Sequence, residues 1–511
     1  MEPALCSRCR GFDAEDPPFI CTVSEGGPCS ACKEGADIRG QIKRLEEEII
    51  KLKEKHHALR ATMNSIHDPF IHTFPPEISS YILRLCLPTL DFGKFHAWPK
   101  RNEVNGALRL GAVCRKWREL AWMTPNLWEM LYLYIGPSTT NSLAKLLPGL
   151  VEAWLGRSGV LPLSISFTND DSERPEIEFA IPRIIEVINL HAGRWRTLLL
   201  NVSSHIPELF SGSTHPSQLV QLQLAIGSRR SRIQQFVMKS KPFPTHLKLR
   251  DFSPTLVDIG WDNITHATLC ALSSNECLEV LRRAPNLEYC YASEIIEHSH
   301  GPTVDPDTPI ILHSRLRILL TAYGVTKFLN AINVPALEEW KHHADGDPSP
   351  ITTMASLLTR SGCCLKMLDL YLSAPSDRDN LPILLQAIPS LECLQLKFRP
   401  NDDIFDRIFR LPADGSIIPL ADASRKTFLP CLQFMGCTEP FSWDRVPQLY
   451  RQGHRRSLTL KSPINRSLIS DKSAMELLEL VDEGAKFQII DTSESGDFLE
   501  NFRKRRKLLV S

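Results

Sequence analysis

The 511-residue sequence has no excess of charge of either sign and no long apolar run. Its 59 basic residues balance 59 acidic ones, so no overall field attracts nucleic acid or an anionic membrane. No charge-free apolar stretch approaches the roughly 18 residues of a membrane-spanning helix, and Met1-Glu2-Pro3 lacks the basic and apolar regions of a signal peptide. We therefore expect a protein of the cytoplasm or nucleus, with reduced cysteines, that binds neither nucleic acid nor a membrane.

The sequence also lacks the short motifs that frame common active sites. It contains no GxSxG, GxxxxGK[ST], GxGxxG or HExxH pattern. Polar clusters at 298–300 (HSH) and 343–347 (HADGD) have loop-like surroundings and give only weak metal-binding signals. A non-catalytic protein is expected, and an enzyme whose site has no local signature is the remaining alternative.

Five of the 15 cysteines crowd the segment 1–36. Four of them form two CxxC pairs with nineteen residues between, a spacing typical of a four-thiolate zinc site: Cys6, Cys9, Cys29 and Cys32. The segment has few large apolar residues, so a structural zinc ion could supply its folding energy. The alternative is a disordered tail, because Cys21 between the pairs would have no role at the metal.

Residues 37–67 show an unbroken heptad pattern over about four repeats. The apolar seam consists of Ile38, Ile42, Leu45, Ile49, Leu52, His56, Leu59, Met63 and Ile66. Isoleucine at a positions with leucine at d positions favours a two-stranded parallel coil. The pattern predicts self-association through residues 38–66. The alternative is a single amphipathic helix folded against its own chain.

Residues 71–135 predict a small unit of three helices. Pro75 and Pro76 fit the first turn of a helix, and Glu77 lies near its positive end. An apolar stripe follows at helical spacing, formed by Ile78, Tyr81, Ile82 and Leu85. Leu83 lies outside this stripe, so more than one side of the helix is apolar. One side can pack on its own unit, and the other needs a partner.

A second apolar stripe predicts one helix over residues 108–123. Its members are Leu110, Val113, Cys114, Trp117, Leu120 and Ala121. The sequence TPNLWEML then predicts a short third helix, with Thr124 as N-cap and Pro125 at the first helical position.

Together these residues resemble an F-box. F-boxes typically begin Leu-Pro-x-Glu-Ile/Leu, continue with Ile at the next turn, and end with a Val-Cys-x-x-Trp-Arg segment. The matching positions are Pro75, Pro76, Glu77, Ile78, Ile82, Val113, Cys114, Trp117 and Arg118. The heptads, "PPEI" and "VCRKWRELAWMTPNLW" closely resemble F-box proteins of mushroom-forming fungi. The loop over 89–105 is longer than in a compact F-box.

The resemblance implies a docking function. F-boxes bind the adaptor Skp1, which bridges to a cullin and a RING subunit in an SCF-type ubiquitin ligase, while the F-box protein selects the target protein. It implies adaptor contacts at Pro75, Pro76, Glu77, Ile78, Ile82, Leu85, Val113, Cys114 and Trp117. Two alternatives remain: a helical unit that packs only on the following repeats, and an interaction scaffold that does not act in ubiquitylation.

Residues 136–194 are expected to bridge this unit to a repeat region. "AKLLPGLVEAWLGRSG" (144–159) predicts a helix, "LPLSISF" (161–167) a strand, and the stretch from 181 a helix that leads into the first repeat.

From 195 to 490 a short strand, a loop and a helical stretch recur. The strand segments are 195–200, 219–224, 244–249, 266–271, 286–291, 315–320, 336–340, 364–370, 390–396 and 431–435. Their starts lie mostly 21 to 29 residues apart, which is the range of leucine-rich repeats. The pattern predicts an irregular solenoid whose broad face binds the target. An ordinary α/β domain is the alternative.

The expected fold class is therefore α+β and multidomain. It consists of a coiled-coil helix, a small three-helix F-box and an irregular α/β leucine-rich-repeat-like solenoid. A basic tail (491–511) follows, in which "RKRRK" (503–507) has the size of a nuclear import signal, although a solvated tail explains it equally well.

Overall fold

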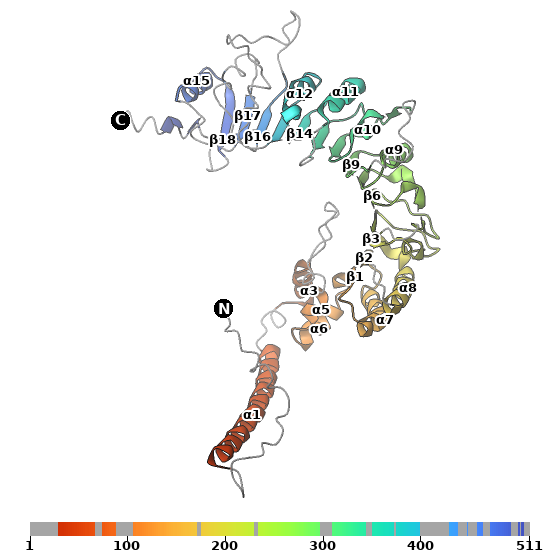
Figure 1. Cartoon of the computed structure of the whole chain (residues 1–511), viewed down its shortest axis with the longest axis vertical. Helices are drawn as coiled ribbons and strands as arrows, with labels where there is room; N and C mark the ends of the chain where they lie inside the picture. The colour runs from red at the N-terminus through yellow and green to blue at the C-terminus, as the bar shows by residue number, and fades with distance from the viewer. Residues whose placement is uncertain are drawn as a thin grey trace, which may run out of the picture. The chain divides into compact units, whose positions relative to one another are not determined.

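The chain is an α+β protein that divides into two compact units, Met1–Leu127 and Trp128–Ser511. The structure is a computed structural model, shown in Figure 1. It describes residues 29–66, 74–87, 106–170, 175–228, 233–296, 309–343, 350–372, 375–398, 429–437, 447, 457–462, 471–491, 499–500 and 502–504. No helix in this described part is both long and apolar enough to span a bilayer.

A single long helix, α1 (Ser30–Ile66), opens the first unit (Figure 1). It contains the whole predicted heptad segment and begins before it, so Cys32 lies in its first turn. The predicted boundary at residue 37 is thus too late, because the four residues after Cys32 continue the helix despite Gly35.

The rest of the first unit consists of short helices. They are α3 (Pro76–Leu85), α5 (Gly106–Gly111), α6 (Arg115–Trp122) and a 3-10 turn, η1 (Pro125–Leu127). Side chains from all four elements are buried in one small core: Ser79, Leu83, Ala107, Ala121 and Leu127.

The prediction of one helix over 108–123 is wrong. The chain leaves the helix after Gly111, and Cys114 has extended backbone angles, φ −156° and ψ 176°. The Cys114 Sγ accepts a hydrogen bond from the Trp117 amide at 3.5 Å, so this residue caps α6. The apolar spacing did not reveal the break because it continues through both helices. The third predicted helix is only the 3-10 turn η1.

Among the described residues of the second unit, fourteen strands form one sheet, and all neighbouring strands are parallel. Their order in the sheet follows the chain. The strands are β1 (Met130–Ile135), β2 (Leu163–Asn169), β3 (Trp195–Ser203), β4 (Gln221–Ser228), β6 (His246–Arg250), β8 (His266–Cys270), β9 (Tyr289–Ser293), β11 (Ile318–Thr321), β13 (Glu339–His342), β14 (Met367–Leu372), β15 (Cys393–Phe398), β16 (Phe434–Cys437), β17 (Ser457–Ser462) and β18 (Lys486–Asp491). Two short strand pairs flank the sheet, β5 (Phe236–Val237) with β7 (Val257–Asp258), and β10 (Ile311–Leu312) with β12 (Ile332–Asn333).

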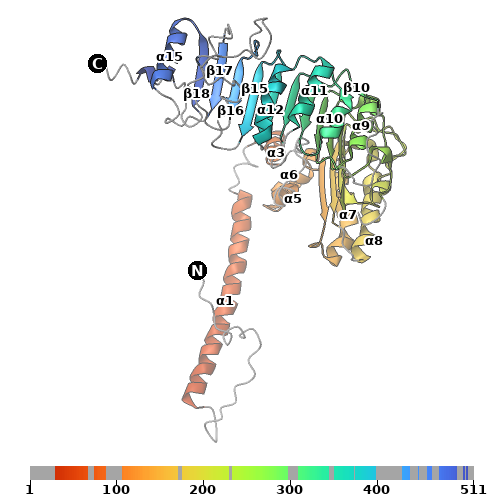
Figure 2. The ribbon, with the colours of Figure 1, turned by 45° about the horizontal axis from the view of Figure 1, so that its top comes forward.

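Helices line one face of this sheet, as Figures 1 and 2 show. They are α7 (Asn141–Arg157), α8 (Pro175–Asn189), α9 (Ser274–Arg283), α10 (Thr326–Asn330), α11 (Ile351–Ser361), α12 (Pro375–Gln386) and α15 (Asp471–Asp482). Alternate strand residues point toward these helices, as Leu247 and Leu249 do in β6, and both are fully buried. The core therefore lies between the sheet and the helices, and the other strand residues belong to the opposite, open face.

Each of the ten predicted strand segments overlaps a strand of the sheet, although most of these strands begin and end a few residues later than predicted. The helix at 144–159, the strand at 161–167 and the helix before residue 195 are confirmed as α7, β2 and α8. The region 136–194 is nevertheless no bridge, because β1 and β2 pair in register with β3 and extend the same sheet. At the other end, Leu499 is 4% exposed and Phe502 packs on the core, so the predicted tail contributes apolar contacts.

Candidate docking surfaces

One side of α3 anchors this helix in the first unit. Ser79 and Leu83, one helical turn apart, are each 1% exposed. The Ser80 Oγ lies 2.9 Å from the Thr124 Oγ1, which itself donates to the Leu120 carbonyl at 2.7 Å. This side therefore carries the packing and the polar contact that hold α3 in place.

The predicted apolar stripe lies on a different side of α3 and is largely exposed. Ile78 is 46%, Tyr81 60% and Leu85 67% exposed, while Ile82 is half-buried. The preceding residues Pro75, Pro76 and Glu77 are also exposed. A surface helix of a globular protein normally turns such a stripe toward the core. In α3 the buried side has one leucine, and the side with more apolar residues remains exposed.

The second half of the predicted motif lies around the start of α6. Val113 is exposed, whereas Cys114 and Trp117 are half-buried. The Arg118 guanidinium donates to the Gly111 carbonyl at 2.9 Å and so joins α6 to the end of α5. The structure thus brings both halves of the motif into one unit, with the cysteine in a capping role.

Two further exposed apolar residues near the motif were not selected from the sequence, Trp122 and Met123. They are 45% and 81% exposed. The helix predicted over 108–123 ran through both residues and placed neither on its apolar stripe. Tyr81, which belongs to the predicted stripe on α3, is 60% exposed, although the expected adaptor contacts did not include it.

Two of the four predicted zinc ligands, Cys6 and Cys9, lie outside the described residues. Cys29 is half-buried directly before α1, and Cys32 belongs to its first turn. Within the described ranges, no cluster of three or more histidine, cysteine or acidic side chains could hold a metal ion.

The open face of the second unit's sheet has an aromatic ladder. His246 of β6, His266 of β8 and Tyr289 of β9 are register partners on neighbouring strands. The two imidazole rings stack with centroids 4.4 Å apart and planes 11° apart, and the tyrosine ring follows at 5.5 Å. All three residues are only partly buried, so the ladder presents ring surface that another molecule can reach.

Threonine hydroxyls position the two histidines. The Thr245 Oγ1 lies 2.8 Å from the His246 Nδ1, and the Thr265 Oγ1 lies 2.9 Å from the His266 Nδ1. Burial lowers the pKa of both imidazoles below the ordinary value, and the neighbouring His266 and Lys248 lower the pKa of His246 further. Neutral rings at pH 7 can stack closely without mutual charge repulsion.

Polar and basic residues follow the ladder along the same strands. Two residues further on are Lys248, Thr268 and Tyr291, and the first two are buried. At the strand ends, the Arg250 guanidinium donates to Glu294 at 2.9 Å and lies 3.3 Å from the Cys270 Sγ. Burial raises the pKa of the Cys270 thiol to about 11, so this thiol is not an activated nucleophile.

A charged cluster occupies the same face on later strands. Asp369 of β14 is 5% exposed and lies 3.0 Å from the His343 Nε2 and 3.2 Å from the Lys397 Nζ. Burial acts to raise the pKa of Asp369, but these two neighbours outweigh it and lower the pKa below its ordinary value. The open face therefore combines aromatic, basic and paired charged groups on neighbouring strands.

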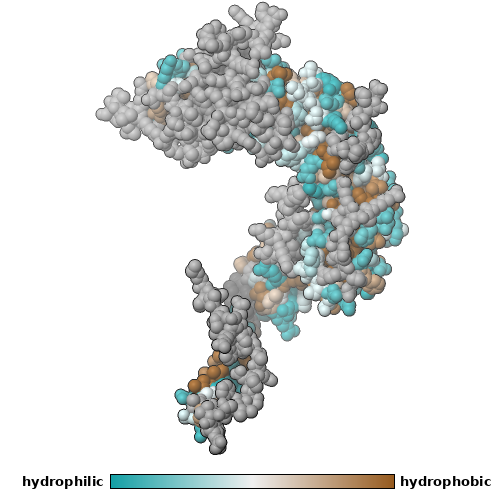
Figure 3. Space-filling view, viewed as in Figure 1, coloured by the Kyte–Doolittle hydropathy of each residue, from teal (hydrophilic) through white to brown (hydrophobic). Residues whose placement is uncertain are grey.

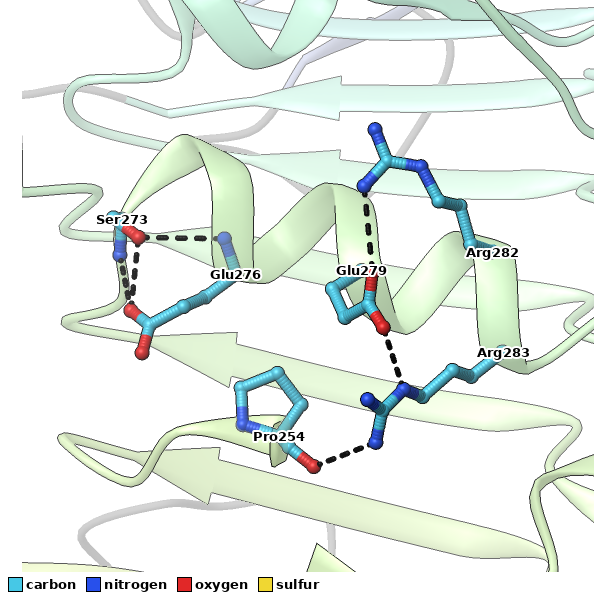
Figure 4. A network of polar contacts seen from close by, with 6 residues as sticks. All are labelled: Pro254, Ser273, Glu276, Glu279, Arg282 and Arg283. Atoms are coloured by element: carbon cyan, nitrogen blue, oxygen red, sulfur yellow. Dashed lines mark hydrogen bonds and ion pairs between the residues drawn. The ribbon is translucent and has the colours of Figure 1, made fainter. Parts of the chain in front are cut away.

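A pocket of about 400 Å³ opens on the helical face, lined in part by Lys241, Asp258, Trp261 and Arg283. Its charged groups already pair: Lys241 with Asp258 at 2.7 Å, and Arg283 with Glu279 at 2.7 Å. Figure 4 shows that Arg283 also donates to the Pro254 carbonyl, at 3.2 Å. A capping box of Ser273 and Glu276 fixes the start of α9 in the same network. Of the contacts that α9 makes here, the Arg283 bond to Pro254 joins this helix to an earlier segment of the chain.

Neither a protein-family model nor a curated protein sequence matches the chain.

Proposed function

We propose that the chain is a non-catalytic substrate receptor of the F-box type, acting in the cytoplasm or nucleus. Its first unit docks to a Skp1-type adaptor, which connects it to a cullin ubiquitin ligase. Its second unit, a leucine-rich-repeat-like solenoid, binds the target protein. Ubiquitin transfer takes place on other subunits of the assembly.

The exposed stripe on α3 is the observation that carries this proposal. Ile78, Tyr81 and Leu85 remain about half or more exposed although Leu83 on the same helix is buried. Full burial of a side chain of this size contributes roughly 1.5–3 kcal/mol, so covering these three offers several kcal/mol to a partner. They follow Pro75 and Pro76, which start the helix and thereby set the direction of the stripe. The sequence pattern that resembles an F-box includes Pro75, Pro76 and Ile78 of this stretch.

The open face of the sheet supports the receptor half of the proposal. Parallel strands in chain order place side chains from distant parts of the sequence in rows, such as His246, His266 and Tyr289. Aromatic side chains and arginine are enriched where proteins recognise each other. No described helix of the second unit covers this face. A target can therefore contact several repeats at once.

Co-purification with Skp1 and a cullin amino-terminal domain tests the proposal. The wild-type chain should retain both proteins, the cullin only when Skp1 is present. Ile78→Asp and Leu85→Asp should each abolish the retention of Skp1 and of the cullin domain, because a carboxylate would be buried at the interface without a partner. Both residues are exposed, so neither change should unfold the first unit.

Leu146→Asp provides the matched control. Leu146 is 63% exposed on α7 in the second unit, so this variant has the same chemical change away from the stripe. It should retain Skp1 as the wild type does. A wild-type chain that binds Skp1 without recruiting the cullin would favour the interaction scaffold, and failure to bind Skp1 would reject the receptor.

A further inference from the structure

The heptad seam of α1 is exposed from Ile38 to Met63. Seven seam residues are between 49% and 58% exposed: Ile38, Ile42, Leu45, Ile49, Leu52, Leu59 and Met63. Apolar atoms of α1 reach the surface in Figure 3, among hydrophilic side chains. Exposed large apolar residues are common singly, but a continuous row at heptad spacing marks an interaction surface. Among the described residues, none packs over this seam closely enough to bury it.

A single α1 helix has little to stabilise it. Gly35 and Gly40 lie in its interior, and a Cβ added at either would meet no atom within 4 Å. No close packing requires these glycines, and each costs about 1 kcal/mol relative to alanine in a helix. Helices of this kind gain most of their stability from packing an apolar face. The exposed seam is the face available for that packing.

We propose that α1 pairs with α1 of a second copy of this chain, in a parallel two-stranded coiled coil. With Ile42 and Ile49 at a positions and Leu45, Leu52 and Leu59 at d positions, the seam has the composition that favours two parallel strands. This inference does not depend on the proposed ligase function.

The charges that flank the seam fit a second copy. In a parallel pair, Glu48 at a g position faces Lys53 at the following e position of the second copy, and Glu34 faces Arg39 in the same way. Each pair occurs twice by symmetry. Near the other end of the helix the flanking charges do not match, because Lys55 faces Arg60 and both are basic. His56, at an a position, faces His56 of the second copy. This polar layer in the seam lowers the affinity and fixes the register.

Pairing would give the chain two of every other surface. An assembly with two open sheet faces binds a target with two copies of its recognition segment more tightly than a single chain does, through effective concentration.

Sedimentation equilibrium of the full chain tests the proposal. At about 20 µM the wild-type chain should have twice its 57.8 kDa mass. Leu52→Asp places a charge in the seam and should give a monomer, because it should raise the dissociation constant of the dimer at least 100-fold. Ile50→Asp is the matched control: Ile50 is 57% exposed on the same helix but lies off the seam, so this variant should remain dimeric.

Two further variants keep the outcome decisive if Leu52→Asp unwinds the helix. His56→Leu should tighten the dimer, because it replaces the polar layer with an apolar one. Leu59→Cys should give a covalent dimer on mild oxidation, beyond any formed by the wild type, since parallel pairing places residue 59 opposite itself. A monomeric wild type, a trimer, or a dimer that survives Leu52→Asp in a helical protein overturns the proposal. A dimer without the Leu59→Cys cross-link overturns its parallel direction.

Discussion

The hydroxyl oxygens of Ser80 and Thr124 lie 2.9 Å apart and join α3 to the turn after α6. These residues belong to the two halves of the F-box-like pattern, which a long loop separates in the sequence. Thr124 Oγ1 donates to the Leu120 carbonyl, so its oxygen accepts the Ser80 hydrogen. The contact fixes α3 with its apolar stripe facing away from the core of the unit.

Removing this contact should loosen α3. We expect Ser80→Ala and Thr124→Val each to lower local stability by about 1 kcal/mol, with a coupling of about 0.5–1.5 kcal/mol in the double variant. Hydrogen exchange at the amides of α3 measures it, because exchange reports local opening. Ser138→Ala, at an exposed serine of the second unit, should leave that exchange unchanged. Strictly additive effects of the two changes would contradict a direct bond.

The sequence located α3 and its apolar residues but could not say which side is buried. Periodicity favoured the stripe of Ile78, Tyr81 and Leu85, yet the core accepts Leu83 with the small Ser79. That choice depends on the shape of α5, α6 and η1, which no local pattern encodes. The break at Cys114 was missed for a related reason, since a cysteine that caps a helix has the same residue type as one that packs in a helix.

Arg194 closes the end of α7. Its guanidinium donates to the carbonyls of Leu155, Gly159 and Leu161 and to the Ser158 Oγ. Arg194→Ala should lower the free energy of unfolding of the second unit by about 2 kcal/mol, because it leaves carbonyls at the helix end without donors. Chemical unfolding measures this change.

Arg194→Lys should recover less than half of that loss, since an ammonium cannot reproduce the planar fork of donors. Arg196→Ala is the control, two residues away and exposed on β3, and should change stability by less than about 0.5 kcal/mol. Full recovery with lysine would show that charge, not geometry, matters at this helix end.

His342 makes the stability of the second unit depend on pH. This residue is 0% exposed, and burial, with His343 beside it, lowers its pKa from 6.5 to about 4. The Trp340 Nε1 donates to the Thr321 Oγ1, and the hydroxyl lies 2.9 Å from the His342 Nδ1. The Thr321 hydroxyl can therefore donate to a neutral imidazole but not to a protonated one.

The sign follows from the two pKa values. Between pH 6.5 and about 4 the unfolded chain binds a proton at His342 that the folded chain does not, so stability falls as the pH falls. From pH 7 to pH 5 this residue should cost about 2 kcal/mol, and His246 and His266 act in the same direction. In His342→Leu the difference in unfolding free energy between the two pH values should shrink by that amount. An unchanged difference would mean that folding does not lower the pKa of His342.

Much of the sheet was predictable strand by strand because many strands have buried apolar residues at a spacing of two, such as Leu247 and Leu249 in β6. Its true start was not. The strand β1 has three aromatic or apolar residues on each face, so it shows no alternation of apolar and polar residues. It also follows the helical turn η1 closely, and the predicted third helix therefore ran into its first residues. The ladder of His246, His266 and Tyr289 was also invisible, since register partners on parallel strands are set by loop lengths rather than by local sequence.

The aromatic ladder should contribute to target binding. We expect His266→Ala combined with Tyr289→Ala to reduce the proteins retained by the full chain about tenfold, because these rings offer flat apolar surface at the open face. Quantitative mass spectrometry of material captured with cullin activity blocked measures the loss. Arg282→Ala, on α9 at the helical face, should retain the same proteins as the wild type (Figure 4). Equal retention by all three chains would place the target elsewhere.

Titration of the purified full chain with purified Skp1, followed by calorimetry, is the most direct test of adaptor docking. We expect a one-to-one complex with a dissociation constant of about 1 µM or tighter, which corresponds to roughly 8 kcal/mol. Ile78→Asp should weaken binding at least 100-fold, and Leu146→Asp should leave it unchanged. No heat of binding for the wild type at about 100 µM, or equal binding by Ile78→Asp, would contradict docking through α3.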